Sequence, residues 1–114
     1  MCFESGSACY IPLKHQTEKV LEKKAVLEKL KIILEDKSVK KIGQNIKYDA
    51  LIMKRYGINL DGIAFDTMIA AHLLNPDRRS YKLDNLSIDY LDYEMIPIEN
   101  LIGPKGKNQK LMYL

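Results

Sequence analysis

The residues best suited to chemistry in this sequence are Asn45 and Asp49, which stand four positions apart. On a helix that spacing places both side chains on one face, one turn apart, with Tyr48 beside them. A carboxylate just after a sheet strand lies where α/β folds commonly bind ligands. The spacing leaves two interpretations open. Either Asn45 caps the helix and Asp49 is a solvated carboxylate near its positive end, or Asp49 binds a metal ion.

Other acidic and titratable positions have a simpler interpretation. Asp66 precedes a short apolar helix, so we expect it to cap residues 67–69 and not to act as a second metal-binding carboxylate. The Asp-x-Glu pattern at residues 92–94 follows a predicted helix and is typical of a polar surface loop. His72 lies in an apolar helix without a neighbouring ligand residue, which favours a hydrogen-bonded core or boundary histidine over catalysis.

Basic residues in the loops are candidates for contact with nucleic-acid phosphates. Arg78 and Arg79 form a pair in a polar loop, and phosphate contact and a solvated charge are both open for them. A solvated charge is the favoured interpretation for three single lysines, Lys47, Lys105 and Lys107.

The elements that must position these side chains alternate along the chain. Hydrophobic spacing and turn residues predict a hairpin at 1–13, strands at 39–43 and 63–65, helices at 18–36, 45–55, 68–74 and 83–91, and one further turn at 98–102. A strand, a glycine turn and a helix in that order are typical of an α/β unit. The sequence therefore predicts an α/β fold.

Composition limits the protein class. A chain of 114 residues with 46% hydrophobic and 29% charged residues is expected to form one domain, residues 1–114, and is not typical of a disordered protein. The net charge of +3 suits a polyanionic partner without requiring one. Cys2 and Cys9 lack zinc-site spacing and are expected to be free thiols. The absence of a membrane-length apolar run and of a signal-peptide pattern predicts a cytoplasmic protein with no membrane partner.

Five stretches occur in an order that is specific to one family: KIGQNIKYD, YGI, GIAFDTMIAAHLLNP, LDNLSIDYL and KGKNQ. Together with the initial CFESGSACYIPL, they resemble the 3′-5′ exonuclease (proofreading) domain of bacterial family-A DNA polymerases. The resemblance implies a ribonuclease H-like fold, in which helices flank a mixed sheet. It also implies membership of the DEDD nucleases, which cleave the 3′-terminal nucleotide with two divalent metal ions.

By this resemblance, Asp49 is the catalytic and metal-binding carboxylate of the family's second motif. The implied cofactor is Mg²⁺ or Mn²⁺, since hard cations suit a water-rich carboxylate site. The implied partner is the 3′ end of single-stranded DNA. The implied substrate-binding residues are Gln44, Asn45, Tyr48, Arg78 and Arg79.

The sequence departs from the family at both ends. The first motif, Asp-x-Glu on the opening strand, is expected before residue 1, and the third, Tyr-x-x-x-Asp on a helix, after residue 114. We therefore expect a truncated fold that lacks its first strand and last helices, and that is unstable or self-associates through the exposed sheet edge. Three functions remain open: part of a proofreading domain, in a longer parent chain with a polymerase domain; a catalytically incomplete nucleic-acid-binding or scaffold remnant; and a helical protein-interaction module that uses residues 18–36.

Overall fold

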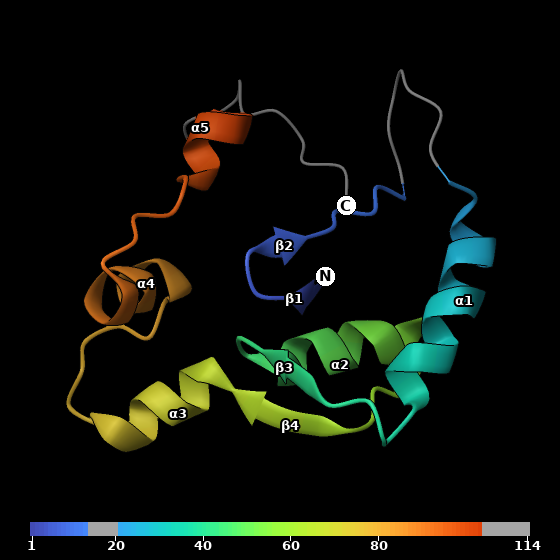
Figure 1. The fold of residues 1–114 in the computed structure, drawn as a ribbon, viewed down its shortest axis with the longest axis horizontal. Coiled ribbons are helices and arrows are strands. Elements are labelled where there is room, and N and C mark those ends of the chain that lie inside the picture. Colours follow the sequence, from blue (N-terminus) through green and yellow to red (C-terminus); the bar gives the residue numbers. More distant parts are fainter. Residues whose placement is uncertain (14–20, 104–114) are drawn as a thin grey trace. The chain divides into compact units, whose positions relative to one another are not determined.

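The computed structural model describes residues 1–13 and 21–103 (Figure 1). Backbone contacts divide the chain into two units, one formed by Met1–Glu28 with Ile98–Leu114 and the other by Lys29–Pro97. Each unit is described by itself. The interpretation of residues 1–114 as one domain stays a prediction.

The first unit contains the predicted hairpin. Strands β1 (Cys2–Glu4) and β2 (Ser7–Ala8) pair in antiparallel fashion, and Gly6 in the turn has a φ of 80°. That positive φ is readily adopted by glycine. The second strand ends at Ala8, and both cysteines are exposed free thiols, as expected. The unit also holds the short helix α5 (Ile98–Ile102), with the predicted bounds.

Helix α1 (Lys23–Glu35) enters the second unit with its C-terminal half. The predicted start at residue 18 lies outside the described residues. Near its end, the Leu34 carbonyl accepts a hydrogen bond from Asp61 N at 2.9 Å, and the Glu35 carboxylate accepts one from Asn59 N at 2.8 Å. Lys31 Nζ donates to the Gly57 carbonyl at 2.9 Å. The helix therefore holds residues 57–61 in place, just before strand β4 (Ile63–Asp66).

The centre of the second unit is a strand-helix-strand arrangement (Figure 1). Strands β3 (Lys41–Gly43) and β4 (Ile63–Asp66) are parallel, and helix α2 (Ile46–Arg55) connects them. The register places Gly43 opposite Asp66. This observation confirms a mixed α/β fold, whereas the ribonuclease H-like fold stays a prediction.

Helices α3 (Thr67–Leu74) and α4 (Leu83–Leu91) follow, and α4 has the predicted bounds. The buried apolar residues in the described part of the chain are Ile46, Ile58, Ala71 and Leu86. Large apolar residues of the strands remain accessible, including Ile42 at 70% and Phe65 at 49%. Within the described ranges, no helix has the length and apolar character that a membrane crossing requires.

Candidate active site

A tight turn between β3 and α2 positions the candidate residues. A Cβ atom at Gly43 would lie 3.1 Å from the Ile46 side chain, so only glycine fits there without displacing that buried residue. Asn45 follows in the left-handed region, with a φ of 55° and a ψ of 44°. Asparagine tolerates this region better than most residues. The turn therefore needs both residue types, glycine and asparagine, close together.

Asp66 caps helix α3, as predicted. Its carboxylate accepts hydrogen bonds from Met68 N at 2.9 Å and Ile69 N at 3.4 Å. The same carboxylate accepts bonds from Asn45 N at 3.1 Å and Ile46 N at 2.9 Å, at the start of α2. The sequence did not predict this second role. Asn45 occupies the N-cap position of α2 as expected, but its side chain makes no capping hydrogen bond.

Asp49 lies in the first turn of α2 and is exposed. Partial desolvation of the carboxyl by neighbouring groups, and secondly the nearby negative charge of Asp66, raise the pKa of the Asp49 carboxyl above its ordinary value. A bound cation would relieve both effects, because it stabilises the ionised form. Asp49 thus has the chemistry of an oxygen ligand for a hard metal ion.

A complete metal centre needs more than this carboxylate. Among the described residues, no group of three or more His, Cys, Asp or Glu side chains could hold a metal ion. The two oxygens of Asp66 already accept four backbone hydrogen bonds. The described residues therefore supply one ligand that suits a divalent metal ion, but they do not supply a complete metal site.

Gln44 connects the turn to the rest of the unit. Its amide nitrogen donates to the Tyr81 carbonyl at 2.8 Å, and its amide oxygen accepts a hydrogen bond from the Thr67 hydroxyl. Both ends of the amide are thus used within the chain. Tyr48, in contrast, is 60% exposed beside Asp49. Nucleotide contacts by Gln44, Asn45 and Tyr48 stay predictions.

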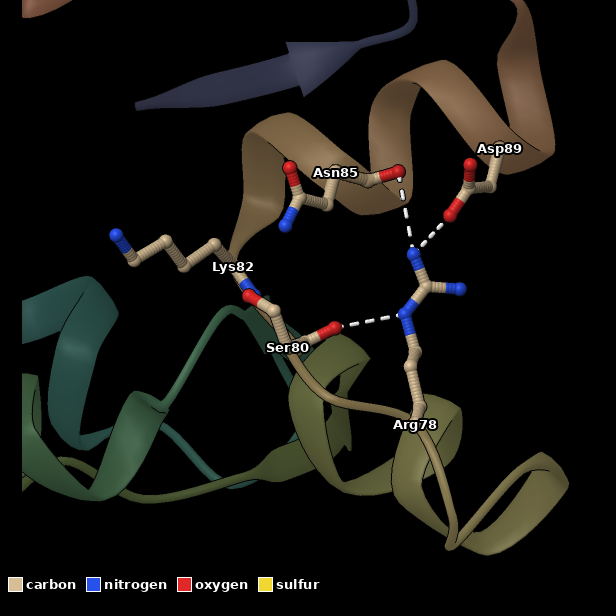
Figure 2. A network of polar contacts seen from close by, with 5 residues as sticks. All are labelled: Arg78, Ser80, Lys82, Asn85 and Asp89. Atoms are coloured by element: carbon tan, nitrogen blue, oxygen red, sulfur yellow. Dashed lines mark hydrogen bonds and ion pairs between the residues drawn. The ribbon is translucent and has the colours of Figure 1, made fainter.

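The two arginines of the predicted phosphate-binding pair have different environments, and Figure 2 shows that of Arg78. The Arg78 guanidinium forms an ion pair with Asp89 of α4 and donates to the Ser80 carbonyl at 2.7 Å and the Asn85 carbonyl at 3.4 Å. Its side chain is only 17% exposed. Arg79 is exposed and makes no hydrogen bond or ion pair with the described part of the chain. Of the two, Arg79 is therefore the better placed for a phosphate.

We expect Arg78→Ala to lower the free energy of unfolding by about 1 to 3 kcal/mol, because hydrogen bonds to charged groups contribute on that scale. Urea denaturation followed by circular dichroism would measure the change. Arg79→Ala is the matched control and should have little effect on stability. Equal stability of the two variants would contradict the structural role of Arg78.

The remaining candidates agree with their simpler interpretations. His72 is exposed and its Nδ1 lies 3.1 Å from the Tyr81 hydroxyl, so it is a hydrogen-bonded residue at the boundary and not in the core. The Asp-x-Glu pattern at 92–94 lies in exposed coil beyond α4. Asp92 ends that helix with a φ of 50°. These features are surface structure.

Because Asp66 is held as a carboxylate, we expect the fold to lose stability in acid. Burial tends to raise the pKa of Asp66, but the four backbone hydrogen bonds outweigh it and hold the pKa below the ordinary value. A lowered folded-state pKa contributes stability above the unfolded value of about 3.9, and this contribution is lost as the pH falls through the folded value. Asp66→Asn should therefore make the stability less dependent on pH below about 4.

Urea denaturation at a series of pH values between about 5 and 2 would test this expectation. Asp84→Asn is a suitable control, because Asp84 is an exposed carboxylate in the first turn of α4. An unchanged pH dependence in Asp66→Asn would show that the four bonds do not hold the carboxylate in its ionised form.

Comparison with known proteins shows where this chain belongs. The sequence profile of the 3′-5′ exonuclease family matches residues 1–107. DNA polymerase I of Pseudomonas aeruginosa is 36% identical over 111 residues, which cover 93% of this chain and 12% of that protein. DNA polymerase I of Rhizobium leguminosarum is 34% identical over 112 residues, covering 89% of this chain and 11% of that protein. The chain thus spans about an eighth of the length of these relatives.

Proposed function

Because this chain belongs to the 3′-5′ exonuclease family, we propose that it forms the part of a proofreading domain that holds the 3′-terminal nucleotide of single-stranded DNA. The observation that supports the proposal most directly is the turn between β3 and α2. It presents Asn45 at the N-cap and Tyr48 and Asp49 on the first turn of α2, just after a parallel strand, and no described residue forms a hydrogen bond with their side-chain polar atoms. A polymerase domain elsewhere in a longer chain is part of the proposal, since the relatives are DNA polymerases.

Asp49 has the role of a ligand for Mg²⁺ or Mn²⁺ in this proposal. Such ions, when bound in pairs, activate a water and stabilise the leaving oxygen in phosphoryl transfer. The other contributions come from side chains that bind and orient DNA. Exposed Tyr48 can contact the terminal nucleotide, and exposed Arg79 can contact a phosphate. Arg78 and Gln44 support the loop and the turn through their contacts within the chain.

The second candidate function is nucleic-acid binding by a catalytically incomplete site. Among the described residues, Asp49 is not joined by a group of carboxylates that could hold a metal ion with it, so these residues fit nucleic-acid binding without hydrolysis better than independent catalysis. We expect the 114-residue chain to show no Mg²⁺-dependent or Mn²⁺-dependent cleavage above background. Incubation with 5′-labelled single-stranded DNA beside an Asp49→Ala control would test this. Cleavage by the parent, lost in the control, would overturn the incomplete-site interpretation.

A salt series would separate nucleic-acid binding from a protein-interaction module. Binding of a fluorescent single-stranded oligonucleotide should be measurable at low salt, and its affinity should fall as salt rises because displaced counterions contribute to binding. Arg79→Ala should reduce the slope of log affinity against log salt concentration by about the value of one phosphate contact. A substitution in the α5 segment, Glu99→Gln, should not reduce it. Absence of DNA binding at low salt would contradict the proposed function and favour the protein-interaction module.

A further inference from the structure

Asp66 is bonded to the first turns of two helices. Its Oδ1 accepts hydrogen bonds from Asn45 N, Met68 N and Ile69 N, at 3.1, 2.9 and 3.4 Å, and its Oδ2 accepts one from Ile46 N at 2.9 Å. The residue is only 9% exposed. Capping α3 alone would need a single oxygen, as serine or asparagine provides. The second oxygen is used for α2 and nothing else in the described structure.

The hydrogen bonds that Asp66 accepts hold the backbone at Asn45, the residue at the N-cap position of α2. The first N–H groups of a helix lack partners within it, and an asparagine at the N-cap normally satisfies one with its own side chain. Here Asn45 is in the left-handed region, and the buried Asp66 carboxylate accepts hydrogen bonds from the N–H groups of Asn45 itself and of Ile46. The Asn45 side chain makes no capping bond, and no other bond to the described residues. Its amide can therefore face a ligand.

A second connection reinforces the same turn. The Thr67 hydroxyl, next to Asp66, donates to the Gly43 carbonyl at 3.3 Å and to the Gln44 amide oxygen. The start of α3 thus holds the turn between β3 and α2 at residues 43–46. Asp49 lies on the first turn of α2, so a shift of this turn would move Asn45 and Asp49 together.

From these contacts we infer that Asp66 is the positioning residue of the 3′-end site. Its carboxylate fastens the first turn of α2 to the first turn of α3, holds Asn45 in its left-handed conformation, and leaves the Asn45 amide available to a nucleotide. That the ligand is a nucleotide rests on the proposed function. The connection that Asp66 makes between α2 and α3 does not. Asp66 acts through Asn45 and the backbone, and has no contact with DNA in this inference.

Two substitutions separate positioning from simple capping. Asp66→Ser keeps an acceptor for α3 but is too short to reach α2, and Asp66→Asn replaces one carboxylate oxygen by an amide group that cannot accept from Ile46 N. Asp84→Ser is the matched control, because it removes an exposed carboxylate from the first turn of another helix. Hydrogen exchange followed by NMR should show the Ile46 amide exchanging about tenfold faster or more in both Asp66 variants, with Met68 little changed in Asp66→Ser.

A double-mutant cycle on DNA affinity tests the link to Asn45. Asp66→Ser and Asn45→Ala should each weaken binding of a single-stranded oligonucleotide with a free 3′ end by about tenfold. The double variant should be little worse than either, because both changes remove the same contact. Additive losses, or an unchanged Ile46 exchange rate in the Asp66 variants, would overturn the inference. Absence of DNA binding by the parent chain would contradict the proposed function, and the exchange rates would still decide whether Asp66 fastens α2.

Discussion

Replacing Asp49 with asparagine should lower metal-dependent hydrolysis of DNA 3′ ends by at least about 100-fold in a complete exonuclease domain. Loss of groups that only orient a metal ligand costs 10- to 100-fold, so loss of a ligand's charge should cost no less. Asparagine has nearly the shape of aspartate but lacks the negative charge and one acceptor oxygen. Activity should also fall as the pH decreases, because the pKa of the Asp49 carboxyl is raised and its protonated form binds a cation poorly.

A chimera would supply the complete domain for this measurement. Residues 1–107 would replace the matching segment of the Pseudomonas aeruginosa polymerase, to which this chain is 36% identical. Release of the 3′-terminal nucleotide would be compared between the chimera and its Asp49→Asn variant, and DNA synthesis would serve as an internal control for folding. Asp92→Asn, from the exposed Asp-x-Glu pattern, is the matched control. Full nucleotide release by Asp49→Asn would contradict the metal-ligand assignment.

Substituting alanine for Gly62 should destabilise the second unit by about 3 kcal/mol, the sum of a strained backbone and an overfilled site. Gly62 has a φ of 70°, and a Cβ there would lie 2.6 Å from the Val39 carbonyl oxygen and 3.0 Å from that of Lys37. Both neighbours are backbone atoms, which cannot rotate away as a side chain can. The Gly62 carbonyl also accepts a hydrogen bond from Lys41 N at 2.9 Å, so a shift would disturb the start of β3.

Gly57 provides a control with the same backbone requirement. Its φ is 73°, but a Cβ there would meet nothing within 4 Å. Gly57→Ala should therefore cost only the conformational strain, about 1 kcal/mol. Urea denaturation of both variants and the parent separates the two contributions. Similar losses for the two variants would show that the backbone around Gly62 can move aside, and that steric contact contributes little there.

Local features of the fold could be predicted because their causes lie within a few residues of each other. The apolar spacing from Leu83 to Leu91 is contained in one helix, and that helix has the predicted bounds. The hairpin depends on a turn glycine between two short strands. Asp66 caps α3 through residues that follow it directly. The ordered motifs also identified the family, since each of them is a continuous stretch of sequence.

The tertiary structure decided how distant residues share the site. Pairing of β3 with β4 places Gly43 opposite Asp66, so one carboxylate accepts hydrogen bonds at the starts of both α2 and α3, while the Asn45 side chain makes no capping bond. No local pattern contains that information, because it depends on the register between two strands. The same holds for Arg78, whose ion pair with Asp89 depends on where α4 lies relative to the preceding loop. The sequence by itself determined which side chains could bind metal and DNA. Folding decided which of them are used internally, because buried polar groups take the nearest partners that tertiary contacts provide.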